Sequence, residues 1–163
     1  MSARPFIDTQ DFARNRSEIS GEAPVSGMER LSDLLADSQG MLRYTLRGNS
    51  DKDGNLYLEV GIEGVCQLLC QRCLHAMSYP VAIANRLLLQ AEDALVQEDD
   101  DAPDSIAPDR HLDLIALLED EVLLSLPIAP KHAEGECVAV YCQADQEGER
   151  HPFAALGQLK VVK

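Results

Sequence analysis

The sequence predicts an α+β domain, an antiparallel β-meander of about four strands packed against one main helix, with short N- and C-terminal helices. Three observations support this prediction. Apolar and polar residues alternate through "LRYTLRG" and "NLYLEVGIE", which is the period of strands with one wet face. Apolar residues recur at helical spacing in "LDLIALLEDEVLLSLP". The length, 163 residues, is ordinary for one domain with its own core. We therefore expect residues 1–163 to form a single domain.

The N-terminal part is expected to be loosely ordered over residues 1–25 and then to form a short amphipathic helix. In "SGMERLSDLLADSQG", Ser26 is followed three positions later by Glu29, which is the spacing of a capping box. Gly40 ends the pattern. One face of this helix would carry Met28, Leu31, Leu34 and Leu35.

Strands are expected from Met41 to Arg47, over 56–63, over 65–69 and over 79–90. The first two flank "GNSDKDGN", which is dense in turn-forming residues and predicts a hairpin. The "CQRC" motif then falls in the turn between the third and fourth strands.

The main helix is expected to begin after Asp113 as N-cap and to stop at Pro127. Near the end of the chain, "HPFAALGQL" predicts a short final helix with Pro152 at its start. Its anchoring side chains would be Phe153, Leu156 and Leu159.

The negative charge is concentrated in one segment. Residues 91–121 hold twelve Asp and Glu residues against Arg110, a local net charge of −11 out of −14 for the chain. Residues 91–110 contain two prolines and little apolar periodicity, which predicts an acidic loop. Such a chain lacks the basic surface that supplies most nucleic-acid affinity. A basic protein partner, or a local arginine patch, suits it better.

The sequence also predicts a cytoplasmic protein. No stretch approaches the run of about 18 apolar residues that a membrane span needs, and "MSARPFIDTQ" lacks the apolar core of a signal peptide. Thiols stay reduced in the cytoplasm, so the five cysteines are poor evidence for a disulfide framework.

The cysteines leave three interpretations open. Cys70 and Cys73, at CxxC spacing, can join His132 and Cys137 in a Cys3His set for structural zinc, with Cys142 in reserve. They can form a thiol-redox pair, although Pro80 limits any helix after the motif and the βαβ surroundings are missing. They can also be reduced, buried cysteines that pack as small apolar side chains.

Three segments, "CQRCL", "LDLIALLEDEVLLSLPIAPKH" and "HPFAALGQLK", resemble the YceD family of large ribosomal RNA subunit accumulation proteins. The resemblance implies a non-enzymatic bacterial factor that supports 23S rRNA accumulation or processing and assembly of the large ribosomal subunit. Many relatives carry a fuller cysteine pattern after the proline segment, where this chain has His132, Cys137 and Cys142. The family-like positions are Cys70, Arg72, Cys73, Leu74, Asp113, Leu114, Glu121, Leu126, Pro127, Pro152 and Phe153.

The expected partner is a large-subunit assembly intermediate, reached through a basic ribosomal protein, 23S rRNA or both. Segment 91–121 would repel phosphate and is expected to engage the basic protein. The candidate contacts on that side are Asp99, Asp100, Asp101, Asp113 and Glu121. RNA or a second partner would meet Arg43, Arg47 and Arg72.

No enzyme activity, membrane or small-molecule substrate is expected. The sequence contains no phosphate-binding glycine loop and no Ser/His/Asp arrangement recognisable by spacing. Two alternatives remain: an acidic adaptor that holds another basic protein, and a protein that uses Cys70 and Cys73 for thiol-redox chemistry.

Overall fold

The computed structural model describes residues 5–91 and 104–137. It confirms the mixed α+β class: strands predominate, and the described residues contain three α-helices. In chain order the elements are β1 (Phe6–Ile7), α1 (Thr9–Arg14), β2 (Glu18–Pro24), the 3-10 turn η1 (Val25–Gly27), α2 (Glu29–Ser32), β3 (Leu35–Asp37), β4 (Met41–Ser50), β5 (Leu56–Leu69), β6 (Ala76–Leu89), β7 (Ser105–Ile106), β8 (Leu112–Asp113) and α3 (Leu114–Ser125).

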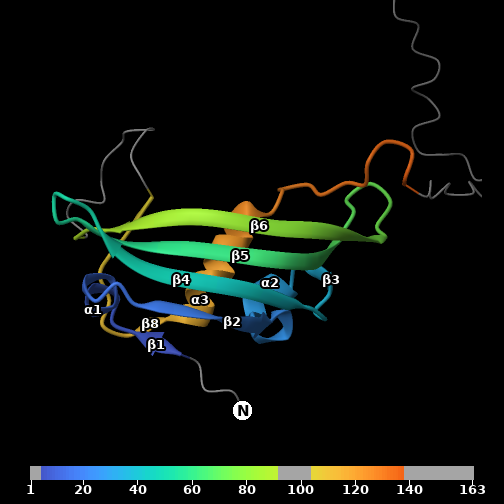
Figure 1. Ribbon diagram of the computed structural model, residues 1–163. Coiled ribbons are helices and arrows are strands. Elements are labelled where there is room, and N and C mark those ends of the chain that lie inside the picture. Colours follow the sequence, from blue (N-terminus) through green and yellow to red (C-terminus); the bar gives the residue numbers. More distant parts are fainter. Residues whose placement is uncertain (1–4, 92–103, 138–163) are drawn as a thin grey trace, which may run out of the picture.

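The main sheet has the strand order β2-β4-β5-β6-β7, and β3 pairs with the end of β5 (Figure 1). All pairs are antiparallel except β6 with β7, which is parallel. β1 and β8 form a separate two-stranded ribbon. The long strands β5 and β6 make a hairpin whose turn carries the CxxC motif, so this motif lies at one end of the sheet.

β5 is one continuous strand of 14 residues, where the sequence predicts a break between two shorter strands. The residue at that break is Gly64. A Cβ atom added at Gly64 would lie 2.6 Å from Cδ2 of Leu42 on β4. Glycine therefore lets the two strands stay in close contact at this point, and the pairing continues from Leu56 to Leu69.

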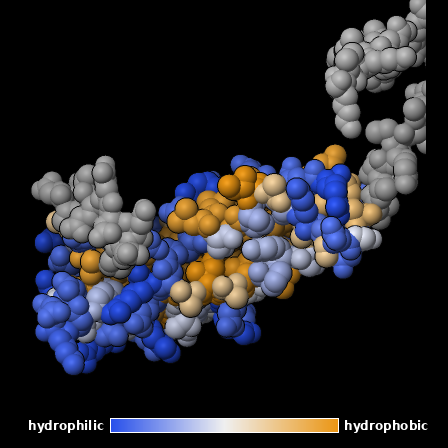
Figure 2. Space-filling model, turned by 90° about the horizontal axis from the view of Figure 1, so that it is seen from above, coloured by the Kyte–Doolittle hydropathy of each residue, from blue (hydrophilic) through white to orange (hydrophobic). Residues whose placement is uncertain are grey.

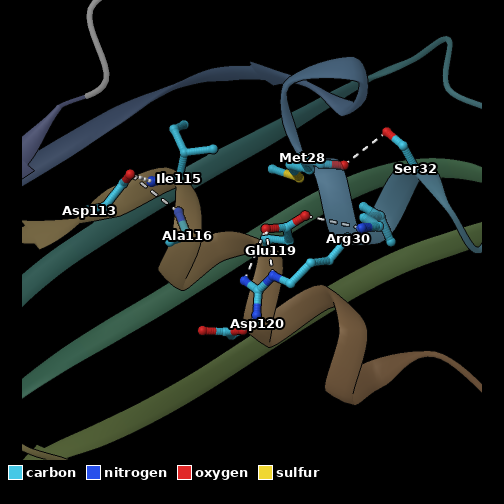
Figure 3. Close-up of polar contacts among 9 residues, drawn as sticks. Met28, Arg30, Ser32, Asp113, Ile115, Ala116, Glu119 and Asp120 are labelled. Atoms are coloured by element: carbon cyan, nitrogen blue, oxygen red, sulfur yellow. Dashed lines mark hydrogen bonds and ion pairs between the residues drawn. The ribbon is translucent and has the colours of Figure 1, made fainter.

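The core lies between the inner face of the sheet and the helices. Side chains such as Leu58 and Ile62 are fully buried, as are Leu118 and Val122 on α3. In Figure 1, α2 and α3 lie on the same side of the sheet, behind β4, β5 and β6. The main helix is confirmed: the side chain of Asp113 accepts hydrogen bonds from the backbone N–H groups at the helix start (Figure 3).

The expectation of a loosely ordered N-terminus is wrong for residues 5–25, which contain β1, α1, β2 and the start of η1. Helix α1 is capped by Asp8 and packs on β4. At the contact, a Cβ added to Gly48 would lie 2.3 Å from the backbone oxygen of Phe12. The missing side chain at Gly48 thus admits the helix, a close approach that no local sequence pattern reports.

The predicted N-terminal helix is much shorter than expected, and its capping box does not form. α2 begins at Glu29 after Met28, which makes no side-chain cap hydrogen bond, and it has only four residues. Leu35 already belongs to β3, where it pairs with Leu68 of β5. Pairing with a long central strand outweighs the local helical pattern, because it adds backbone hydrogen bonds and burial together.

Two predicted segments fall largely outside the described residues. The acidic loop is described only at Ala91 and from Asp104, where β7 pairs with β6. The C-terminal helix at 152–159 lies outside the description altogether. Among the helices of the described ranges, none combines the length and the apolar character needed to cross a bilayer.

Candidate metal centre

The turn between β5 and β6 brings Cys70 and Cys73 together. The Leu74 N–H donates to the Cys70 carbonyl at 2.9 Å, and the Cys70 N–H donates to the His75 carbonyl at 3.0 Å. Leu74 has a φ of 58°, which a leucine adopts only at a cost in strain. Both cysteines are buried, with exposures of 0% and 3%. The turn therefore holds two buried sulfur atoms in a tightly hydrogen-bonded loop.

The segment after α3 supplies the other two ligands. It runs from the end of the helix to the β5–β6 turn, and the Gln71 N–H donates to the Pro130 carbonyl at 2.9 Å. A second turn follows, in which Gly135 has a φ of 86° and the Glu136 N–H donates to the Ala133 carbonyl. The chain reverses there, which returns Cys137 to the side of His132.

The four candidate ligands meet as the sequence predicts. The ligand atoms of Cys70, Cys73, His132 and Cys137 all lie within 4.8 Å of one another. The Cys70 and Cys137 sulfurs are 3.6 Å apart, and Nδ1 of His132 lies 3.4 Å from the Cys73 sulfur and 3.7 Å from that of Cys137. Ligands bound tetrahedrally at zinc distances lie about 3.8 Å from one another. The donor set and its spacing therefore suit a tetrahedral zinc ion.

The electrostatics of the cluster favour loss of a proton from one thiol. Burial favours the neutral form of Cys70, but backbone N–H groups of His132 and of the turn donate to its sulfur and lower the pKa of Cys70 to about 5. The His75 N–H acts to lower the pKa of Cys73, but burial and the neighbouring thiols outweigh it, so this pKa is raised. The sulfurs of Cys70 and Cys137 raise the pKa of His132.

Arg72 belongs to this cluster as well. Its Nε donates to the sulfur of Cys137 at 2.9 Å, and its guanidinium also contacts the Ala133 carbonyl at 3.4 Å. The Cys137 sulfur in turn raises the pKa of Arg72. Three thiolates and a neutral imidazole around a divalent cation carry one net negative charge, which this guanidinium balances. The sequence predicts a partner contact for Arg72 and does not reveal this interaction with sulfur.

The arrangement differs from that of a helix-activated dithiol. Such a site places the CxxC at the start of a helix, whose N-terminus stabilises the thiolate. Here the motif lies in a turn between two strands and supplies two of the four candidate ligands. The other two come from the segment after α3. The remaining described cysteine, Cys66, is buried on the inner face of β5, where burial raises the pKa of its thiol. Cys142 lies outside the described residues.

The other predicted contact residues are dispersed. Arg43 and Arg47 lie on the outer face of β4, and Arg47 forms an ion pair with Glu18 at 3.1 Å. Asp113 caps α3. Glu121 is buried and accepts a hydrogen bond from Asn85 at 3.0 Å. The run Asp99, Asp100 and Asp101 lies outside the described residues.

Glu119 is a structural residue that sequence reasoning missed. It is 6% exposed and pairs with Arg30. For Glu121 the sequence does contain a signal of burial: it follows Leu117 by four positions and Leu118 by three, which places it on the apolar face of the helix. Glu119 carries a similar signal, because it follows Ile115 by four positions and precedes Val122 by three. Its partner Arg30, however, is 89 positions away and cannot be inferred from local spacing.

Comparison with known proteins places these features in a family. A family model described as large ribosomal RNA subunit accumulation protein YceD matches residues 58–160. A Haemophilus influenzae protein named large ribosomal RNA subunit accumulation protein YceD is 25% identical over 167 residues, with 94% of each chain covered. No solved structure shows a significant match. Because the family model spans more than half of the sequence, including all four candidate ligands, the chain belongs to the YceD family.

Proposed function

We propose that this protein supports accumulation of the large-subunit ribosomal RNA by binding to an assembly intermediate, without catalysing a reaction. The observation that carries the proposal is the family match over residues 58–160, which includes most of β5 and all of β6, α3 and the ligand cluster. The Haemophilus influenzae relative, named for the same process, covers nearly the whole chain. We further propose that the RNA concerned is 23S rRNA and that the protein acts in the cytoplasm.

The metal in this proposal is structural zinc. Residues Cys70, Cys73, His132 and Cys137 would hold it, and zinc would cross-link the β5–β6 turn to the segment after α3. The hydrogen bonds from Gln71 to the Pro130 carbonyl and from Arg72 to the Ala133 carbonyl already join this segment to the turn. Because ligands from two segments are gathered only in the folded chain, the free energy of zinc binding contributes to folding.

We propose that the direct partner is a basic ribosomal protein or assembly factor. The formal charge of −14, concentrated in residues 91–121, attracts such a partner and repels phosphate. Asp104 and Asp109 are exposed, and the sequence adds the Asp99 to Asp101 run between β6 and β7. Asp113 caps α3, and Glu121 accepts a hydrogen bond from Asn85. We therefore assign the partner contact to the acidic loop, residues 91–110.

Direct RNA binding through the outer sheet face has weaker support. Arg43 on β4 stands opposite Glu22 and Glu63 on the neighbouring strands, and Arg47 is paired with Glu18. The positive charges on this face are thus matched by carboxylates. A protein-mediated contact with the assembly intermediate is the route we favour.

The test of function compares cells with and without the gene. Loss of the gene should lower the ratio of 23S to 16S rRNA and the amount of large subunits in sedimentation profiles, and the intact gene should restore both. A ratio that stays unchanged contradicts the proposed function and favours the acidic adaptor. Restoration by a variant with Asp99, Asp100 and Asp101 changed to asparagine would contradict the role of the acidic loop.

A thiol-redox function is the second candidate, because the pKa of Cys70 is lowered to about 5. A low thiol pKa favours the nucleophilic thiolate. The zinc-free protein should then reduce a disulfide substrate while Cys70 and Cys73 are oxidised to a disulfide, and added dithiothreitol should sustain turnover by reducing that disulfide again. Cys70→Ser should abolish this activity while the protein keeps its fold. In the zinc proposal, the same substitution lowers zinc affinity and stability together.

A further inference from the structure

An apolar groove of about 250 Å3 lies beside the candidate metal centre. One wall comes from the end of β5 and the β5–β6 turn, and the other from the end of α3 and the segment that follows it, while Leu34, between α2 and β3, completes the lining. None of the lining residues is charged. The residues that matter here are Leu34, Leu69, Gln71, Leu126, Ile128 and Pro130.

This groove leaves large apolar side chains in water. Ile128 is 104% exposed, and Leu34 is 57% exposed. Hydrophobic side chains gather along the middle of the molecular face in Figure 2, between more hydrophilic regions. The groove is smaller than the roughly 300–1,000 Å3 of a typical small-molecule site, so it suits a few side chains of a peptide segment.

The two walls are tied to each other. The Gln71 N–H on one wall donates to the Pro130 carbonyl on the other at 2.9 Å. The candidate ligands Cys70 and His132 each adjoin one of these residues within two positions along the chain. The segments that form the two walls are therefore the same segments that supply the cluster's ligands.

We propose that this groove is the docking site of the chain's own C-terminal segment, residues 152–159. The segment reads "PFAALGQL" and contains no charged residue. Phe153, Leu156 and Leu159 recur every three positions, so in a helix they share one side and can enter the groove together. This apolar segment matches the uncharged lining of the groove.

Charge complementarity supports the same occupant. Residues 151–163 contain Lys160 and Lys163 and no acidic residue, although the chain as a whole is strongly acidic. Asp33 and Asp37 are exposed and stand on either side of the groove residue Leu34 in the sequence. A helix seated by its apolar side can therefore bring its basic end near these carboxylates.

The tether makes the docking feasible. Cys137 lies in the cluster beside the groove, and 14 residues separate it from Pro152. A chain of that length spans up to roughly 45 Å when extended. A segment joined to its binding site by a short linker has an effective concentration on the order of millimolar when the linker can span the distance. A contact too weak to hold two separate molecules is therefore sufficient within one chain.

The test measures amide hydrogen exchange of the full-length, zinc-loaded protein. Phe153→Asp should raise exchange in peptides that cover 67–71 and 126–130 by about tenfold, as expected for the loss of one well-buried apolar side chain. Ile128→Asp should raise exchange in peptides that cover 152–159 by a similar factor. Because Ile128 is fully exposed in the described fold, its substitution should leave the core intact.

Two matched controls decide the outcome. Leu124→Asp changes an 83% exposed leucine on α3 that does not line the groove, and it should leave exchange at 152–159 unchanged. Tyr141→Asp should leave the groove walls unchanged. The proposal is overturned if Phe153→Asp has no effect on the walls, or if Tyr141→Asp exposes them instead. A protection that increases with protein concentration would assign the groove to a second copy of the chain and would also overturn it.

Discussion

Arg30 and Glu119, which are 89 positions apart in the sequence, form a salt bridge between α2 and α3 with a nitrogen to oxygen distance of 3.0 Å. The other oxygen of Glu119 accepts the backbone N–H of Leu31, also at 3.0 Å (Figure 3). The Glu119 side chain is only 9% exposed, whereas Arg30 is half exposed. This carboxylate fixes α2 against the helix that leads to the candidate metal centre.

Replacement of Glu119 by alanine should destabilise the fold. The Leu31 N–H would stay buried without its partner, which costs about 1–3 kcal/mol in the free energy of unfolding. Asp120 is the matched control, since it also binds Arg30, at 2.6 Å, but is 52% exposed. Asp120→Ala should change stability little, because exposed ion pairs contribute little. Equal losses for the two variants in urea denaturation would contradict this assignment.

The same carboxylate should make stability depend on pH. Burial alone raises the pKa of Glu119, but the Leu31 N–H and Arg30 outweigh it, and this pKa lies below the ordinary 4.5. A lowered pKa in the folded state means that Glu119 stabilises the protein above pH 4.5 and loses this effect as the pH falls through the folded value. Glu119→Gln should therefore be less stable at pH 7, with a difference that narrows below pH 4.5. A constant difference from pH 7 to pH 3 would contradict this.

The four-ligand cluster should bind one zinc ion per chain. Removal of zinc by a chelator should lower the melting temperature, and Cys73→Ser should lower both zinc content and melting temperature. Cys66→Ala is the control, because Cys66 is buried in the core outside the cluster and its loss should leave zinc content unchanged. Metal analysis and calorimetry provide the two measurements. Full zinc content in Cys73→Ser would remove this residue from the ligand set.

Arg72 should strengthen zinc binding without contacting the ion. Its hydrogen bond to the Cys137 sulfur stabilises the thiolate and orients it, and loss of such outer contacts typically costs 10–100-fold in affinity, so Arg72→Gln should weaken zinc binding by about that factor. Lys131→Gln is a control of equal charge change on the neighbouring segment. Competition with a zinc-binding dye measures both. Identical affinities for the two variants would show that only net charge matters.

Gly48 should be intolerant of a side chain. An added Cβ would lie 2.3 Å from the Phe12 carbonyl oxygen, so Gly48→Ala should push α1 from β4 and cost about 1–3 kcal/mol or more. Gly61 lies in the neighbouring strand, and there the nearest atom to an added Cβ is 3.8 Å away. Gly61→Ala should be neutral or slightly stabilising. The melting temperatures of the two variants test this. A similar decrease in both would mean that the steric clash at Gly48 is not the cause.

Local patterns determined several parts of this protein. Alternation of apolar residues along β4 and β5 reports one buried face, because side chains in a strand point to opposite sides. Asp113 and Pro127 mark the limits of α3, since a cap and a proline act on the backbone next to them. The spacing of Cys70 and Cys73 likewise indicates a shared turn. Each of these signals acts within a few residues.

The tertiary structure alone decided the rest. It ordered the N-terminal residues through a close contact at Gly48, and it replaced part of a predicted helix with β3, because pairing with β5 stabilises more than the local pattern does. It also brought Arg72 into a hydrogen bond with the sulfur of Cys137, and Glu119 into a salt bridge with Arg30. These are interactions between residues far apart in the chain. Their free energies depend on distance and burial, which exist only once the chain has folded.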